Sequence, residues 1–171
     1  KHFFQKAINI LLSRVPSNKT SGNCLLSAIA ITEIIMRDIG GVVVINCVNL
    51  PSEGPFCLKN RAGNSELDLL QLPDNDTGYA FQEEAIKLNQ SGISVHLFCT
   101  HETNKGTSSY CDISTISILS RLTNGKCHFY DNFDDIQKKN LRNDLFETLS
   151  GQYLFSSYST FVRPRINSYL F

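Results

Sequence analysis

The sequence lacks several features that would assign it to a common functional class. Sixteen Lys and Arg residues balance sixteen Asp and Glu residues, so the chain has no basic excess of the kind that nucleic-acid binders carry. No apolar run approaches the roughly 18 residues of a membrane-spanning helix. No segment matches GxGxxG or the P-loop pattern, and the glycines of GGVVVINC precede their strand, on the wrong side for a phosphate cradle. We therefore expect no nucleic-acid, membrane-spanning or nucleotide-binding role.

Catalytic constellations are equally scarce. There is no GxSxG nucleophile elbow. The nearest Cys–His pair is Cys99 with His101, and we interpret Cys99 as a core residue and His101 as part of a solvated loop. His96 and His128 lie within predicted strands, where a core or edge histidine is more common than a ligand. A hydrolase that uses Cys99 and His101 is the enzymatic alternative.

Acidic residues form two clusters, both beside turn-forming residues. Paired carboxylates can bind Mg²⁺ or perform acid–base chemistry. Next to Pro, Gly and Asn, however, Asp residues commonly cap helices and form turns. We interpret both clusters in this second way. Their members are Asp74 and Asp76 in the first cluster, and Asp131, Asp134 and Asp135 in the second.

Six cysteines are present, and none forms a CxxC pair. A chain of 171 residues can bury a sizeable core without disulfides, so we favour a reducing compartment. Glycosylation-type triplets that begin at Asn18, Asn75 and Asn89 support a secreted alternative with disulfides. The cysteines are Cys24, Cys47 and Cys99, which lie in apolar segments typical of the core, and Cys57, Cys111 and Cys127.

Helical and strand patterns alternate along the chain. Apolar residues at helical spacing predict helices over residues 3–14, 21–38, 79–90, 112–122 and 135–149. Apolar or aromatic runs predict strands over residues 42–48, 93–100 and 126–133, followed by an extended segment over 153–171. A strand that is apolar on both faces, such as VVVINCV, is typical of the centre of a parallel sheet. The order predicts an α/β fold: a doubly wound, mostly parallel sheet with helices on both faces, ending in an extended strand.

Five segments, in their order along the chain, resemble one family. They are SGNCLLSAI, GGVVVINCVNLPSEGPFCLKNR, LNQSGISVHLFCT, YCDISTISILSRLTNGKCHFYDNF and FVRPRIN. Together they resemble the trunk domain of the COPII vesicle inner-coat proteins, from about residue 20 to residue 168. LPSEGPFCLKNR is similar to the cargo-adaptor pattern of Leu-Pro, two variable residues, Gly-Pro, then Leu-Lys-x-Arg. DISTISILSRLTNGKCHFY is similar to the adaptor's Asp-Leu-Ala-Thr-Leu run with its Gly turn and aromatic strand, which favours the adaptor over its GTPase-activating sister.

This resemblance implies a von Willebrand A-like fold without enzymatic activity. Residues 1–154 would form the C-terminal part of the trunk, and residues 155–171 the strand that leads to a β-sandwich. It implies a cytoplasmic coat protein, peripheral on endoplasmic-reticulum membranes and COPII vesicles, in transport from the endoplasmic reticulum to the Golgi. Its partners would be the sister inner-coat subunit, export signals of cargo proteins and, indirectly, the coat's small GTPase. A structural zinc is implied only for an upstream domain, and no cofactor for this chain.

Related A-domains can hold a metal between a Thr before one helix and an Asp after the following strand. Here the Thr position is occupied by Lys19, or by Thr20 after a shift of one residue. After VVVI, the strand continues with Asn46, Cys47 and Val48, without an Asp. Because hard cations prefer carboxylate and other oxygen ligands, we predict no metal in this chain. Another A-like module for adhesion or complex assembly, secreted and metal-dependent, is the non-enzymatic alternative.

Two sets of residues are candidates for partner binding. The family shows Met-Arg-x-Arg at the trunk exit, where the arginines bind acidic export signals, and this chain has Arg163 and Arg165 there. Two arginines at i and i+2 on a strand face the same side, although the intervening proline departs from the pattern. The loop after the first strand would form a docking rim through Glu53, Lys59 and Arg61, because ligands gather at the carboxyl ends of strands.

Overall fold

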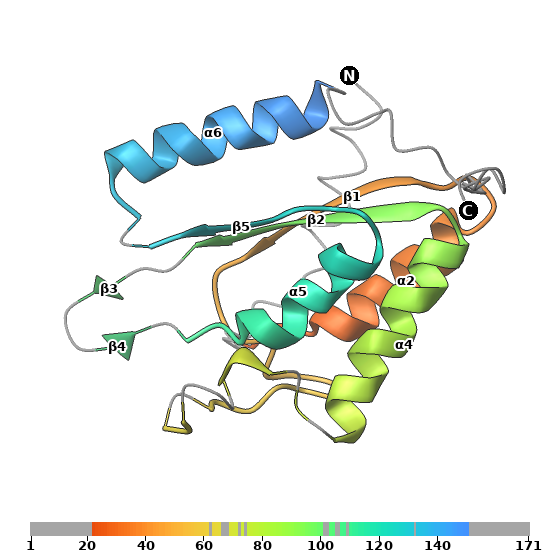
Figure 1. The fold of residues 1–171 in the computed structure, drawn as a ribbon, viewed down its shortest axis with the longest axis horizontal. Coiled ribbons are helices and arrows are strands. Elements are labelled where there is room, and N and C mark those ends of the chain that lie inside the picture. The colour runs from red at the N-terminus through yellow and green to blue at the C-terminus, as the bar shows by residue number, and fades with distance from the viewer. Residues whose placement is uncertain are drawn as a thin grey trace, which may run out of the picture.

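A three-stranded parallel sheet with helices on both faces forms the centre of the chain (Figure 1). The computed structural model describes residues 22–61, 63–65, 69–71, 73, 75–100, 103–104, 107–108, 110–131 and 133–150. The helices are α2 (Leu25–Met36), α4 (Asp76–Gln90), α5 (Ile113–Leu122) and α6 (Asp135–Leu149). The strands are β1 (Gly41–Cys47), β2 (Ile93–Thr100), β3 (Thr103–Asn104), β4 (Thr107–Ser108) and β5 (Cys127–Tyr130). The α/β class is confirmed, while the predicted helix 3–14 and tail 153–171 lie outside the described residues.

The central strand β2 is buried along its whole length, although Ser94, His96 and Thr100 interrupt its apolar residues. The strand VVVINCV, which was expected at the centre, forms β1 at the edge of the described sheet, and its residues alternate in exposure because only one face packs on the core. Strand β2 pairs in parallel with β1 on one side and β5 on the other, in the order β1-β2-β5. Alternate residues of β2 point to opposite faces. The main core therefore forms on the face that carries Val95, Leu97 and Cys99, against apolar residues of α2, α4 and α5. These are Ile29, Phe81, Ala85, Leu88, Ile116 and Leu119.

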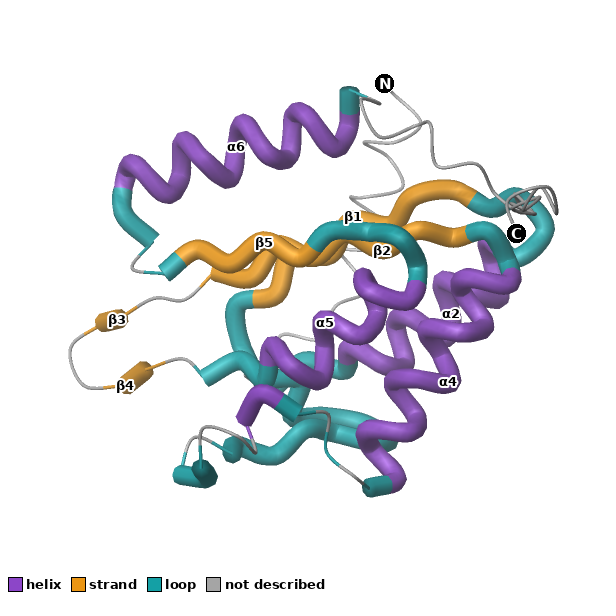
Figure 2. The backbone as a smooth tube through the Cα atoms, in the orientation of Figure 1, coloured by secondary structure: helices purple, strands orange, loops and turns teal. Residues whose placement is uncertain are grey.

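The two faces of the sheet are covered unequally. Figures 1 and 2 show α2, α4 and α5 below the sheet and only α6 above it. Helical spacing places Leu141, Leu145, Phe146 and Leu149 on one face of α6. Phe146 and Leu149 are nevertheless exposed, and Thr148 is the one residue of this helix that is buried. No helix among the described residues is long and apolar enough to cross a membrane.

Helix boundaries follow local capping chemistry. Asp134 caps α6 by accepting a hydrogen bond from the Gln137 N–H at 2.8 Å, as predicted for Asp134 or Asp135. Helix α4 begins three residues before its predicted start, because the Asn75 side chain caps it by accepting from the Gly78 N–H at 3.0 Å. The helix expected over residues 21–38 is shorter.

At its C-terminal end, α2 stops where Gly40, at φ +68°, donates its N–H to the Met36 carbonyl at 2.8 Å. At its N-terminal end, Gly22, Asn23 and Cys24 lie outside the helix. Asn23 donates its side-chain amide to the Asn49 carbonyl at 2.9 Å rather than capping the helix. The start of this helix is therefore determined by a contact with the loop after β1.

Two predictions about strands need correction. The segment 101–110 was expected to be a polar loop, but it contains the short antiparallel pair of β3 and β4. The strand expected over residues 126–133 ends at Tyr130. Tyr130 pairs with Thr100, the last residue of β2, so β5 has no neighbouring strand beyond that point to continue the hydrogen-bond ladder.

The turn before β5 provides a test of this packing. A Cβ added to Gly125 would overlap the backbone carbonyl of Val95 in the central strand. We expect Gly125→Ala to lower the free energy of unfolding by at least about 2 kcal/mol, because backbone of a core strand cannot give way cheaply. Gly63→Ala is the matched control, since its Cβ would meet open space. Equal midpoints for both variants in urea unfolding would contradict the argument.

Candidate functional site

The loop after β1, residues 48–61, forms the candidate docking rim. It leaves the carboxyl end of β1 and passes below α5 towards the start of α4 (Figure 1). The Leu58 N–H donates to the Pro51 carbonyl at 2.7 Å, which closes the loop on itself. Pro51 and Leu58 are both buried, so the base of the rim is attached to the core while its tip faces solvent.

The rim packs tightly against the segment before α2. The Glu53 N–H donates to the Asn23 carbonyl at 3.1 Å. A Cβ on Gly22 would overlap Cγ of Glu53, and a Cβ on Gly54 would overlap Sγ of Cys24. Gly54 also has φ +82°, which favours glycine. The SGNC and SEGP segments therefore contact each other, and each supplies a glycine where the two backbones approach closely.

Arg61 anchors the far end of the rim to α5. Its Nε and Nη2 donate to the two carboxylate oxygens of Asp112 at 3.0 and 2.7 Å, a bidentate ion pair. Nη2 also donates to Ser114 Oγ at 2.8 Å. Asp112 is the residue before α5, and it accepts from the hydroxyls of Ser114 and Thr115, each at 2.8 Å. Both oxygens of the Asp112 carboxylate are therefore hydrogen-bonded within the fold.

The pairing changes the interpretation of Arg61. Its side chain is 15% exposed and that of Asp112 is 2% exposed. The hydrogen bond with Asp112 raises the pKa of the Arg61 guanidinium above its ordinary value. We expected Arg61 to lie on the docking rim beside Glu53 and Lys59. In the structure Glu53 and Lys59 are exposed, whereas Arg61 points inward and positions the loop.

Phe56 is a rim residue that the sequence analysis did not single out. Its side chain is 49% exposed, and its backbone has φ +56°. A bulky residue rarely adopts this left-handed conformation, which costs on the order of 1 kcal/mol. The Gly-Pro-Phe order could have drawn attention to this turn, but no local pattern shows that the aromatic ring faces solvent. Phe56 therefore lies between Glu53 and Lys59 as an apolar element of the rim.

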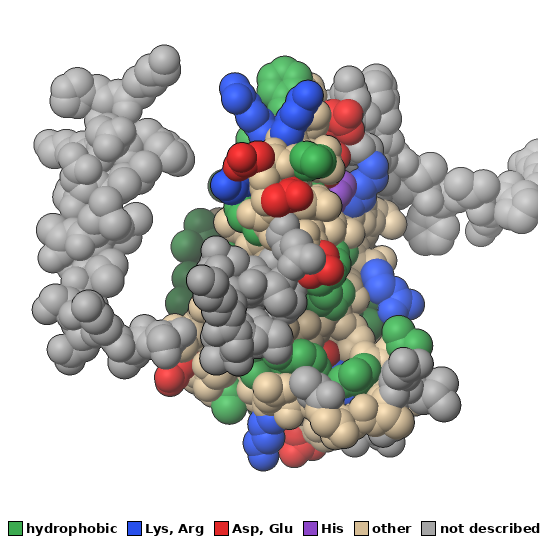
Figure 3. Space-filling view, turned by 90° about the vertical axis from the view of Figure 1, so that its left-hand side faces the viewer, with side chains coloured by type: hydrophobic (Ala, Val, Ile, Leu, Met, Phe, Trp, Pro, Cys, Tyr) green, Lys and Arg blue, Asp and Glu red, His purple; other side chains and the backbone are tan. Residues whose placement is uncertain are grey.

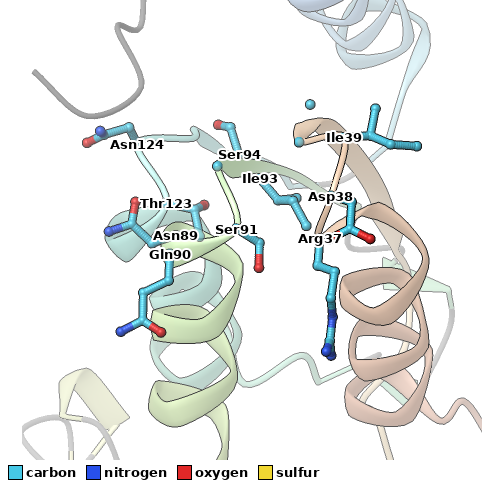
Figure 4. Close-up of a pocket in the computed structure, with 13 residues that line it drawn as sticks. Arg37, Asp38, Ile39, Asn89, Gln90, Ser91, Ile93, Ser94, Thr123 and Asn124 are labelled. Carbon is cyan, nitrogen blue, oxygen red and sulfur yellow. The ribbon is translucent and has the colours of Figure 1, made fainter.

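Two hollows lie near opposite ends of the sheet. One of about 240 Å³ adjoins the rim and is lined by Lys59, Arg61 and Asp112, among other residues. The larger one, of about 400 Å³, lies between the C-terminal ends of α2 and α4 (Figure 4). It is at the amino ends of the strands, opposite the edge where open α/β sheets bind ligands. The guanidinium of Arg37, which lines this larger hollow, is paired with the carboxylate of Glu33 at 2.8 Å.

The chemistry of Cys99 does not favour the hydrolase alternative. Its thiol is fully buried. Hydrogen bonds with Cys111 and Cys127, together with burial, raise the pKa of Cys99 well above the ordinary value for a thiol. A nucleophilic cysteine requires the opposite shift. His101 lies outside the described residues, as do Arg163 and Arg165.

At the end of β1, where related A-domains place an Asp, this chain has Asn46, Cys47 and Val48. Asn46 and Val48 are exposed at the end of β1, and Cys47 is buried between them. Among the described residues, no group of three or more His, Cys, Asp or Glu side chains is arranged to hold a metal ion. Lys19 and Thr20 lie outside the described residues.

Acidic and basic side chains are mixed on the end of the molecule from which β3 and β4 project. Figure 3 looks at the end from which β3 and β4 project, and acidic and basic side chains alternate at its top. One such pair on α6 joins Lys138 and Asp135 at 2.9 Å, with both side chains exposed. No continuous patch of charge of one sign is visible in this view.

His128 of β5 lies on the opposite face of the strand from Cys127 and stacks on Phe98, with ring centroids 4.9 Å apart.

The Arg61–Asp112 pair yields a quantitative prediction. Removing Arg61 leaves a buried carboxylate without its cation, so we expect Arg61→Ala to lower the free energy of unfolding by about 2–4 kcal/mol. Lys138→Ala removes an ion pair that is exposed on both sides and should cost less than about 0.5 kcal/mol. Chemical unfolding of both variants measures the difference. A small, equal effect of the two substitutions would show that the pair does not anchor the rim.

Comparison with known proteins gives a consistent result. The model of the Sec23/Sec24 trunk domain matches residues 2–149. Protein transport protein SEC24 of Scheffersomyces stipitis is 32% identical over 135 residues, which are 74% of this chain and 14% of the relative. The SEC24 protein of Komagataella pastoris is 31% identical over 101 residues, which are 56% of this chain and 10% of the relative. The chain thus spans only a small part of these relatives.

A solved structure supports the same fold. The human COPII-coat protein Sec24c superimposes with a TM-score of 0.65 over 84% of this chain and 20% of that chain, at 22% identity. At that identity the likeness shows the fold alone. The family model, which covers most of the residues, shows the relationship. The chain therefore belongs to the Sec23/Sec24 trunk-domain family, and it is of the Sec24 type.

Proposed function

We propose that the chain is part of a COPII cargo adaptor and works as a non-catalytic scaffold in transport from the endoplasmic reticulum to the Golgi. The observation that carries this proposal is the family match over residues 2–149, together with relatives named protein transport protein SEC24. The site chemistry supports it, because Cys99 is buried with a raised thiol pKa and the rim presents contact residues instead of a nucleophile. Such an adaptor acts at the cytoplasmic side of the membrane as a peripheral protein.

Exposed apolar residues support a scaffold role. Ile31, Ile34 and Ile35 of α2 are exposed at helical spacing, and Val42 and Val44 of β1 are exposed on the sheet. Proteins usually protect edge strands with charges, bulges or covering elements. Val42 and Val44 alternate with Val43 and Ile45, which pack on the core beside α2, so the exposed valines and the exposed isoleucines of α2 lie on opposite sides of the sheet. Exposed apolar surface is typical of interaction sites. We assign these exposed apolar residues to contacts within the assembled coat.

The docking rim is the surface that we assign to the sister inner-coat subunit. Glu53 and Lys59 are exposed, with opposite charges, and Phe56 provides an apolar centre between them. Aromatic residues surrounded by a polar rim are typical of the parts of interfaces that contribute most of the affinity. Arg61 takes no part in the contact, but its pairing with Asp112 holds the loop in place.

The rim is tested by measuring affinity between the full-length protein and the sister inner-coat subunit. We expect Phe56→Ala combined with Glu53→Lys to weaken binding at least about tenfold, because the apolar contact is lost and a charge is reversed. The control is Lys139→Glu, a charge reversal at an exposed position of α6. Unchanged affinity for the rim variant would remove the rim from the interface. Absence of any binding by the unmodified protein would contradict the adaptor proposal itself.

The cargo-binding proposal concerns Arg163 and Arg165, and it is tested separately. Full-length protein is incubated with immobilised peptides that carry acidic export signals. We expect Arg163→Ala with Arg165→Ala to weaken a subset of these peptides by more than about 1 kcal/mol, because charge-assisted hydrogen bonds are lost. Arg142→Ala, an exposed arginine of α6, should leave binding unchanged. Unchanged binding of every peptide by the double variant would reject the arginine pair and leave the adaptor assignment standing.

A further inference from the structure

Four of the six cysteines lie together near the carboxyl end of the sheet. Cys47 ends β1 and is aligned with Cys99 of β2. Cys127 begins β5 and hydrogen-bonds with Cys99. Cys111 comes from the segment before α5 and hydrogen-bonds with both Cys47 and Cys99. All six cysteines are free thiols in the structure. The fold therefore brings cysteines that are far apart in the sequence into one thiol cluster. The proposed adaptor function does not involve these thiols.

Within this cluster, Cys47 and Cys111 have the geometry that precedes a disulfide. Their Sγ atoms are 3.7 Å apart, in direct contact. A disulfide requires the sulfurs to approach to about 2.05 Å with the Cβ atoms about 3.5–4.5 Å apart, so the two side chains must turn further towards each other from this contact. Cys47 is almost fully buried, whereas Cys111 is partly exposed. Cys111 is therefore the more accessible residue of the pair.

We propose that Cys47 and Cys111 are a site of oxidative modification, at which a low-molecular-weight disulfide such as oxidised glutathione converts the two thiols into an intramolecular disulfide. The deprotonated sulfur of Cys111 attacks one sulfur of the reagent, which forms a mixed disulfide and releases one thiolate. The sulfur of Cys47, after losing its proton, then attacks Cys111 and releases the second thiolate. The two protein thiols are oxidised, the reagent is reduced to two thiols, and these take up the two protons.

Oxidation of the neighbouring Cys99 and Cys127 is the competing route to an intramolecular disulfide. Cys127 is exposed, and its hydrogen bond with Cys99 lowers the pKa of the Cys127 thiol. Cys127 can therefore react with the same reagent. Cys99, however, is fully enclosed. Contact with Cys111 and burial raise the thiol pKa of both Cys47 and Cys99, so acidity does not separate the two routes. Geometry favours Cys47, whose sulfur is in direct contact with that of Cys111 at 3.7 Å. We expect Cys127 to be modified without forming an intramolecular link.

A disulfide between Cys47 and Cys111 would strengthen the attachment of the rim loop to the start of α5. Cys111 directly precedes Asp112, to which Arg61 is bound, and Cys47 directly precedes the rim loop. A Cys47–Cys111 bond would close a covalent ring around residues 47–111, parallel to the ion pair. Because long rings restrict the unfolded chain most, oxidation should raise the unfolding midpoint markedly.

The test is mass spectrometry of the full chain after treatment with oxidised glutathione and alkylation of the remaining thiols. Cys47 and Cys57 share the tryptic peptide 38–59, so the measurement uses a Cys57→Ser background. We expect a link between peptide 38–59 and peptide 106–121, together with a rise of at least about 5 °C in the unfolding midpoint of the oxidised protein. Glutathione attached to Cys127 is expected as a separate, unlinked product.

Two further variants make the result decisive. Cys111→Ser should abolish both the link and the rise in midpoint, whereas Cys24→Ser, at an exposed thiol outside the cluster, should leave both unchanged. A dominant link between peptides 88–105 and 127–138 would assign the disulfide to Cys99 and Cys127 and overturn the proposal. Mixed disulfides alone, without any intramolecular link in the folded protein, would overturn it as well.

Discussion

The ion pair between Arg61 and Asp112 is the contact on which the arrangement of the rim depends. It joins the end of the loop after β1 to the residue before α5, and both partners are largely removed from solvent. A buried charge is costly unless it is paired and fully hydrogen-bonded, and Ser114 and Thr115 complete the bonding of this carboxylate. The loop can therefore project its tip into solvent while its base remains ordered.

The motifs that carry the family resemblance contact one another in the structure. The Arg of Leu-Lys-x-Arg binds the Asp that begins the DIST segment, at Arg61 and Asp112. The glycines of SGNC and SEGP, Gly22 and Gly54, allow these two segments to approach closely. These residues are separated in the chain but form one connected layer around the loop. Their recurrence as motifs thus has a physical basis in packing and charge pairing, without any catalytic role.

Much of the fold was predictable because helices and strands leave periodic patterns. The strand 93–100 and helix 135–149 were predicted with the observed bounds, and Asp134 caps that helix as expected. Features that depend on tertiary contacts were not predictable in this way. The strand that begins at Cys127 ends early because β2 offers no further partner, and α6 leaves Phe146 exposed because burial depends on what lies opposite the helix.

By itself, the sequence determined the α/β class, the order of the elements and the family, since these depend on local periodicity and on motif order. Only the tertiary structure decided that Arg61 turns inward, and that Cys47 lies against Cys111. Each of these contacts joins residues more than 50 positions apart, at separations of 51 and 64. A local pattern carries no information about such distances, because they are determined by how the loop and α5 pack on the same end of the sheet.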